Sequence, residues 1–362
     1  MSQVHLAVSD ILSFRHMLVG ELQEFLRSEG LDFDAAAAGL GEVLVALSRY
    51  REEGIPLYPS LFLCEDLPAM MQRLGGRDHF PVGSGPREPA TMRTALKHCA
   101  PLGLNDWSIY VVQHADRYDY GLFRTEGFVL SRTAMGRMRE LLDRDVRIVG
   151  VVQLAENVLE LRGSAGGRRL IYLSGAPSDA LPAIALIRRL STVATWHVDE
   201  QVRQRVQIFL QRVFIDAMRA PHGSLIAVLP QGTRPGDLFN DGIVLERPIQ
   251  VPALVRAYQR EHAEVDRASV QAASYLLQGM LSVDGITVLT SDGAVVAYNA
   301  FLRLHADHVM PAARVGGARR RAFQALSTMV GSSLVGAFMR SQDGLADCDI
   351  VPDDSPLLGP PA

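Results

Sequence analysis

Three consecutive arginines follow a pair of glycines in the last third of the chain. Gly316 and Gly317 precede Ala318 and then Arg319, Arg320 and Arg321, and the segment AFQALSTMV that follows has a helical apolar pattern. Glycines allow close approach to the backbone, the first turn of a helix offers unpaired N–H donors, and arginines add charge-assisted hydrogen bonds. Because basic side chains at a helix start are mildly unfavourable for the helix itself, an anionic ligand would explain them. The segment therefore predicts a phosphate site.

An aspartate and a glycine stand directly before a predicted strand pair. The segments ITVLT (286–290) and AVVAYNAFL (294–302) are joined by a Ser-Asp-Gly turn, which is typical of a hairpin. Asp284 and Gly285 precede the first strand, so the carboxylate is expected to project from the edge of a sheet. Taken alone, Asp284 is typical of an ordinary turn residue, but the neighbouring glycine and the arginine segment favour a binding role.

The near-absence of lysine excludes one common type of nucleotide site. Of the 36 basic residues, Lys97 is the only lysine, and its surroundings, RTALKHCAPL, contain no glycine-rich loop. A P-loop requires a lysine after its glycines, so this type of nucleotide site is excluded. Arginine remains as the phosphate ligand, and its planar guanidinium group suits bidentate contacts.

Composition limits the other partners. The chain has 362 residues, of which 48% are hydrophobic and 21% are charged, enough for one large or two ordinary domains. The net charge of −4 gives no overall basic field, so we expect neither DNA nor a membrane surface as a partner. With no long apolar run and no secretory leader, the chain is expected to be cytoplasmic. The three scattered cysteines are expected to be reduced.

The motifs of the last third resemble those of a known family. VDGITVLTSDGAVVAYNAFL followed by GGARRRAFQALSTMVGSSLVGAFMRSQDG resembles the diadenylate cyclase (DAC) domain. That family carries Asp-Gly-Ala before a strand pair, Gly-Thr-Arg-His-Arg-Ala at a helix start, and a later Ser-Glu-Glu. The likeness extends upstream through HGSLIAVL and DGIVLERPIQVPALVRAY, so we place it over residues 118–350.

The departures from these motifs fall mainly on catalytic positions. Asp284-Gly285-Ile286 keeps the aspartate, and the arginine segment keeps its glycine and both outer arginines but lacks the threonine and histidine. Ser341-Gln342-Asp343 keeps the serine, whereas the two glutamates are replaced. This pattern is similar to that of the DAC-related predicted sensor domains, such as the DACNV group, which are thought to bind a nucleotide without making one.

The resemblance implies an α/β fold with a mixed central β-sheet flanked by helices, after a helical N-terminal region. Apolar periodicity, composition and the resemblance together predict four parts: a helical region (1–53), an accessory α/β region (54–117), the DAC-like domain (118–350) and a disordered, proline-rich tail (351–362). The implied nucleotide-binding residues are Asp284, Gly285, Gly317, Arg319, Arg320, Arg321, Ser341 and Asp343. Asp284 and Asp343 would hold Mg²⁺ or Mn²⁺ if a metal is used.

Three functions follow as hypotheses. The first is a nucleotide-binding sensor module in second-messenger signalling or a conflict system, with ATP or a cyclic dinucleotide as ligand and a separate effector protein. The second is an active diadenylate cyclase that makes cyclic di-AMP from two ATP molecules as a face-to-face homodimer, with Asp284 as a catalytic residue. The third is an interaction module whose arginines pair with a partner's acidic residues and which binds no nucleotide.

Overall fold

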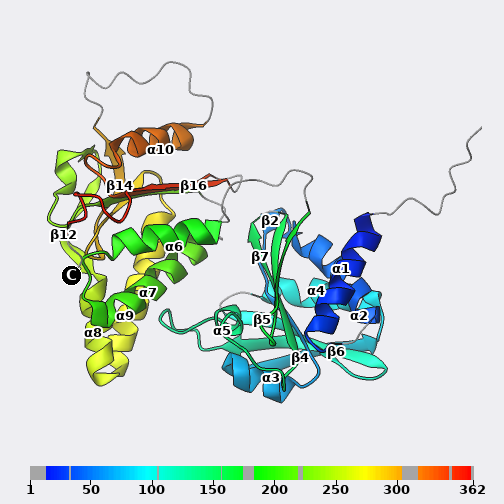
Figure 1. The fold of residues 1–362 in the computed structure, drawn as a ribbon. Helices are drawn as coiled ribbons and strands as arrows, with labels where there is room; N and C mark the ends of the chain where they lie inside the picture. The colour runs from blue at the N-terminus through cyan, green and yellow to red at the C-terminus, as the bar shows by residue number, and fades with distance from the viewer. Residues whose placement is uncertain are drawn as a thin grey trace, which may run out of the picture. The chain divides into compact units, whose positions relative to one another are not determined.

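A computed structural model of the chain describes residues 14–31, 34–103, 106–155, 157–173, 183–218, 223–303, 317–341 and 345–359. The chain divides into two compact units, each built on its own sheet (Figure 1). Unit 1 comprises Met1–Gly127 and Ser131–Pro177, and unit 2 comprises Phe128–Leu130 and Ser178–Ala362.

Unit 1 is built on a seven-stranded mixed sheet with the strand order β4-β6-β5-β3-β7-β8-β9. Only β3 and β5 pair in parallel within it, as far as the described residues show. A separate ribbon pairs β1 with β2. The elements are α1 (Phe14–Ser28), α2 (Asp34–Leu47), β1 (Arg51–Glu52), β2 (Ile55–Pro56), β3 (Leu61–Cys64), α3 (Leu67–Leu74), β4 (Gly76–Pro86), α4 (Pro89–Cys99), η2 (Ala100–Leu102), β5 (Trp107–Gln113), β6 (Arg117–Thr125), α5 (Ala134–Met138), β7 (Ile148–Ala155), β8 (Val158–Gly163) and β9 (Arg168–Tyr172).

Both faces of the unit 1 sheet are covered by helices. Side chains alternate along a strand, so β5 sends Ile109 and Val111 to one face and Tyr110 and Val112 to the other. The first pair is buried with side chains of α1, α2 and α4, and the second pair with side chains of α3 and α5. The strand is therefore apolar along most of its length instead of alternating with polar residues.

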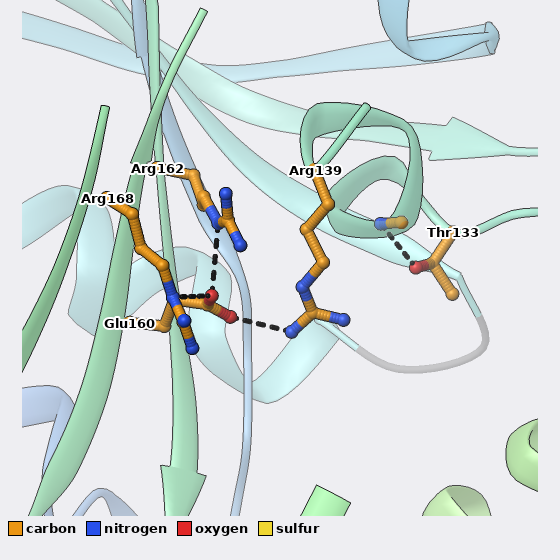
Figure 2. A network of polar contacts seen from close by, with 6 residues as sticks. Thr133, Arg139, Glu160, Arg162 and Arg168 are labelled. Carbon is orange, nitrogen blue, oxygen red and sulfur yellow. Dashed lines mark hydrogen bonds and ion pairs between the residues drawn. The ribbon is translucent and has the colours of Figure 1, made fainter. Parts of the chain in front are cut away.

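A buried carboxylate connects three segments of unit 1 (Figure 2). Glu160 on β8 is 1% exposed. Its Oε2 accepts a hydrogen bond from Arg139 Nη2 at 2.7 Å, and its Oε1 accepts from the Nε atoms of Arg162 and Arg168 at 3.0 Å each. Burial raises the pKa of Glu160, but Arg139 and Arg162 outweigh this effect and hold the pKa below its usual range. Because Arg139 directly follows α5, whose first turn is capped by Thr133, the carboxylate ties this helix to β8 and β9.

Unit 2 is also built on a seven-stranded mixed sheet. The strand order is β11-β14-β13-β10-β15-β16, and β12 pairs with β14 as well. β10 and β13 run parallel, whereas β15 is antiparallel to β10. The elements are α6 (Ala183–Ala194), α7 (Glu200–Met218), β10 (Ser224–Leu229), η3 (Pro235–Asp237), β11 (Phe239–Asn240), β12 (Ile243–Gln250), α8 (Val251–Glu261), α9 (Glu264–Leu281), β13 (Ile286–Thr290), β14 (Ala294–Leu302), α10 (Ala318–Met329), β15 (Gly336–Arg340) and β16 (Ala346–Ile350).

Helices cover the two faces of the unit 2 sheet unequally. Ile226 and Val228 of β10 are buried in a core with residues of α6, α7, α8 and α9. Leu225 and Ala227, which point the other way, are buried with Phe323 and other residues of α10. Among the described residues, α10 is the helix that packs on this second face, and its start carries the three arginines.

The predicted fold class is confirmed. The chain is α/β, with mixed sheets flanked by helices, and α1 precedes the sheets. The hairpin predicted at 286–290 and 294–302 is also confirmed, since β13 and β14 have these bounds and pair antiparallel. As far as the described residues show, two seven-stranded sheets and the two-stranded ribbon are present in place of one central sheet.

The division into units differs from the predicted boundary at residues 117 and 118. β6 begins at this point and pairs with β5 on one side and β4 on the other, so a domain boundary here would divide a sheet. The helices α1 and α2, predicted as a separate region, bury their apolar faces in the same unit. Long-range strand pairing, which local patterns do not reveal, therefore places β6, β7, β8 and β9 in unit 1, whereas Phe128–Leu130 belong to unit 2.

The end of the chain also differs from the prediction of a disordered tail at 351–362. Val351 and Leu358 are 2% and 1% exposed and belong to the core beneath α6 to α9. Trp196 Nε1 donates a hydrogen bond to the carbonyl oxygen of Gly359 at 3.3 Å. Burial of two apolar side chains thus fixes residues 351–359 despite their proline content; residues 360–362 lie outside the described part.

Within the described ranges, no helix is both long enough and apolar enough to cross a lipid bilayer.

Candidate functional site

Several predicted site residues lie at one end of the strands of the unit 2 sheet, where β10 and β13 begin and β15 ends. This end of the strands is called the site edge below. Because β10 and β13 are parallel neighbours, the residues that precede them, Gly223 and Asp284-Gly285, lie at the same edge. β15 runs antiparallel to β10 and ends there, with Arg340 opposite Ser224. The order of strands therefore brings together residues that are more than 100 positions apart in the sequence.

Arg319 in the first turn of α10 reaches this edge. Its Nη2 lies 3.4 Å from Oδ1 of Asp284, and their side chains are 27% and 91% exposed. A Cβ atom on Gly223 would lie 2.6 Å from Arg319 Nη1 and would overlap the carbonyl oxygen of Arg340. A glycine at 223 therefore leaves the space that the guanidinium group occupies.

Gly285 is a second position at this edge where only glycine fits. Its φ is +90°, and a Cβ atom there would lie 2.7 Å from the carbonyl carbon of Asn299 on β14. Asn299 itself has a φ of +50°, a conformation that asparagine tolerates better than most residues. The two residues set the sharp entry to β13 and thereby the direction of the Asp284 backbone.

The start of α10 lacks a side-chain cap. Its N-cap is Gly317, which has no side chain to accept hydrogen bonds from the first-turn N–H groups. These donors carry the positive end of the helix dipole. Arg320 and Arg321 are exposed on the same helix, so Arg319 is the arginine of the triplet that the structure brings to Asp284.

Ser341 lies at the same edge but takes part in a turn. Its backbone N and its Oγ both donate to the carbonyl oxygen of Leu345, at 2.8 and 3.1 Å, which closes the connection between β15 and β16. Asp343, predicted as a nucleotide and metal ligand, lies outside the described residues. The role of Ser341 shown here is structural, and its oxygen lone pairs remain able to accept a hydrogen bond.

The fit of Mg²⁺ or Mn²⁺ rests on one carboxylate. Asp284 is accessible, but it is paired with a guanidinium group, and no cluster of three or more metal-ligating side chains occurs among the described residues. Mg²⁺ is often held by one or two carboxylates when phosphate oxygens complete its shell. Asp284 alone would therefore hold a metal only together with a bound phosphate, where the metal would neutralise phosphate charge.

Three residues at the edge were not predicted from the sequence as site residues: Gly223, Asn299 and Arg340. Arg340 ends β15 and is 8% exposed. Their positions could have pointed to them, because each of these residues lies at or near the end of a segment with a clear strand pattern.

No family model and no curated protein matches this chain.

Proposed function

We propose that unit 2 binds a nucleotide at this sheet edge and that the chain is a nucleotide-binding sensor module. The observation that carries the proposal is the position of Arg319, which lies over Gly223, 3.4 Å from Asp284, at an uncapped helix start. Guanidinium and backbone N–H donors at one point suit a phosphate group. The motif resemblance to the DAC domain supports a nucleotide as the source of that phosphate.

The pairing of Arg319 with Asp284 does not oppose ligand binding. Because the carboxylate is almost fully exposed, the ion pair is worth at most about 1 kcal/mol. A phosphate oxygen that accepts from the same guanidinium gains roughly 1.5–3 kcal/mol as a charge-assisted hydrogen bond. A bound phosphate therefore displaces the Asp284 contact at low cost and leaves the carboxylate available to a ribose hydroxyl.

A thermal-stability screen tests this proposal. The full chain is heated with ATP, cyclic di-AMP and cyclic di-GMP in turn, and ligand-induced stabilisation is compared in Arg319→Gln, Arg321→Gln and Arg256→Gln. We expect at least one nucleotide to stabilise the wild-type chain and the Arg256→Gln control, and to lose this effect in Arg319→Gln. Arg256 is a suitable control because it is an exposed arginine of unit 2 that pairs with Asp199. Absence of a response to every nucleotide would favour the interaction module.

Diadenylate cyclase activity is the second candidate, and it rests on the exposed carboxylate of Asp284. We propose that, if the chain is a cyclase, this carboxylate and a metal would serve the attacking ribose hydroxyl. Incubation with ATP and Mn²⁺ followed by mass spectrometry tests it, with Asp284→Asn as the matched variant. A cyclic dinucleotide formed by the wild type alone would replace the sensor proposal, whereas unchanged ATP would remove the cyclase.

A further inference from the structure

Unit 1 contains a cavity that the proposed nucleotide site does not involve. Its volume is about 710 Å³, within the range of roughly 300–1,000 Å³ typical of small-molecule sites. The walls are formed by residues of β4, β5 and β6 and by the segment that leads into α3, all within unit 1. Two of the lining residues, Tyr110 and Val112, point to the face of the sheet that is covered by α3 and α5.

A largely buried tyrosine, Tyr110, lines this cavity. Tyr110 on β5 is 3% exposed and lines the wall, and within the described structure its hydroxyl makes no hydrogen bond. Burial raises the pKa of Tyr110 to about 12, so the phenol stays protonated and can both donate and accept. A Cβ atom at Gly121 would lie 2.7 Å from this hydroxyl, so the glycine keeps the space around it open. The hydroxyl therefore retains its capacity to hydrogen-bond a ligand in the cavity.

The cavity wall carries three carboxylates, of which that of Glu65 is paired with Arg147 at 3.3 Å. The lining residues that the structure describes include the carboxylates of Glu65, Asp66 and Asp119 and the imidazoles of His79 and His114, but no lysine or arginine. Such a wall disfavours phosphates and other anions and favours a cation.

Two of these carboxylates are held in place by the protein. Asp66 caps α3, and its Oδ1 accepts from the backbone N of Ala69 at 2.9 Å. Asp119 contacts Nε2 of His114 at 2.9 Å and Nε of Arg117 at 3.0 Å. A carboxylate has about four acceptor positions, so both groups can accept further hydrogen bonds while their orientation is fixed. Fixed acceptors reduce the ordering cost of binding.

We propose that this cavity binds a small organic cation, an amine on an apolar or aromatic body. The ammonium group would lie against Asp66 and Asp119, and the body would lie against the ring of Tyr110 and the side chains of Pro81 and Val112. An organic cation is favoured over a metal ion because no metal-ligating cluster of three or more residues occurs among the described residues. This inference does not depend on the proposed function of unit 2.

A charge series on one ring tests the inference. Tyramine, 4-ethylphenol and 4-hydroxyphenylacetate share a phenol and differ in carrying an ammonium, no charge or a carboxylate. Binding of each to the full chain is titrated by ligand-observed NMR. We expect tyramine to bind at least about tenfold more tightly than the neutral phenol and the carboxylate not to bind. Equal affinities across the series, tighter binding of the carboxylate, or no binding of tyramine would overturn the proposal.

Two variants locate the binding and one serves as a control. Asp119→Asn should weaken tyramine binding by about tenfold, and Tyr110→Phe should weaken it while leaving the ring in place. Asp78→Asn, which changes a β4 carboxylate that pairs with Arg124 away from the cavity wall, should have no effect. Tyramine affinities unchanged by both cavity variants would contradict the assignment. If Asp119→Asn fails to fold, Tyr110→Phe and the charge series on the wild type remain decisive.

ATP affinity, measured on the same samples, reports on unit 2 separately.

Discussion

Replacement of Glu160 by glutamine should strongly destabilise unit 1. Glutamine keeps the shape of the side chain but removes the charge that three guanidinium groups share. Arg139 and Arg162 are 22% and 20% exposed, so water cannot fully replace the carboxylate, whereas Arg168 is 51% exposed. Breaking a fully buried ion pair costs about 3–5 kcal/mol. Because these arginines keep partial access to water, we expect a loss of about 2–4 kcal/mol in the free energy of unfolding.

Urea denaturation combined with hydrogen exchange measures this loss. Exchange of the amides in β7, β8 and β9 assigns the effect to unit 1, which matters because the two units can unfold separately. The matched control is Asp78→Asn, whose ion pair with Arg124 at 2.6 Å joins side chains that are 53% and 47% exposed. The control should lose less than about 1 kcal/mol. Equal losses in the two variants would refute the reasoning.

The effect of Glu160 should also depend on pH. Its pKa is lower in the folded chain than the ordinary value of about 4.3 expected on unfolding. The stabilisation is therefore complete above the unfolded pKa and is lost as the pH falls through the folded pKa. The difference in stability between wild type and Glu160→Gln should shrink as the pH falls below about 4. A difference that stays constant in this range would contradict the assignment.

Three further predictions concern other parts of the chain. Gly285→Ala should cost at least about 1–3 kcal/mol because of its positive φ and its contact with Asn299, whereas Gly236→Ala, with open space around it, should change thermal stability little. Cys64, whose pKa is raised by burial to about 12, should resist iodoacetamide in the native chain and react on unfolding, as mass spectrometry will show. Leu358→Ala should lower the unfolding free energy of unit 2 by about 2–4 kcal/mol in urea, and a change near zero would indicate an unpacked C-terminal segment.

Local patterns in the sequence were sufficient to predict the hairpin of β13 and β14 and the helix α10. The strand segments have alternating or continuous apolar residues bounded by a turn, and the helix has apolar residues at helical spacing. Their bounds depend on neighbouring residues only. Asp284 and Arg319 could be predicted as site residues in the same way, since Asp284 lies just before β13 and Arg319 lies in the first turn of α10.

Features that depend on distant residues could not be predicted. β4 contains Gly83-Ser84-Gly85-Pro86, a composition typical of a loop; the strand lies at the sheet edge, where glycine and Pro86 are tolerated because one side needs no ladder hydrogen bonds. The pairing of β6 with β4 and β5, which places this strand in unit 1, has no local signal. The contact between Arg319 and Gly223 requires knowledge that β10 and β13 are parallel neighbours.

Calorimetric titration of the full chain with the nucleotide selected by the stability screen tests the central claim most directly. We expect saturable binding to the wild type, an affinity at least about tenfold lower in Arg319→Gln, and an unchanged affinity in Arg256→Gln. The predicted loss corresponds to one charge-assisted hydrogen bond from the guanidinium beside Gly223 and Asp284. Binding of equal strength in all three proteins, or no binding to the wild type, would contradict a nucleotide site at this edge.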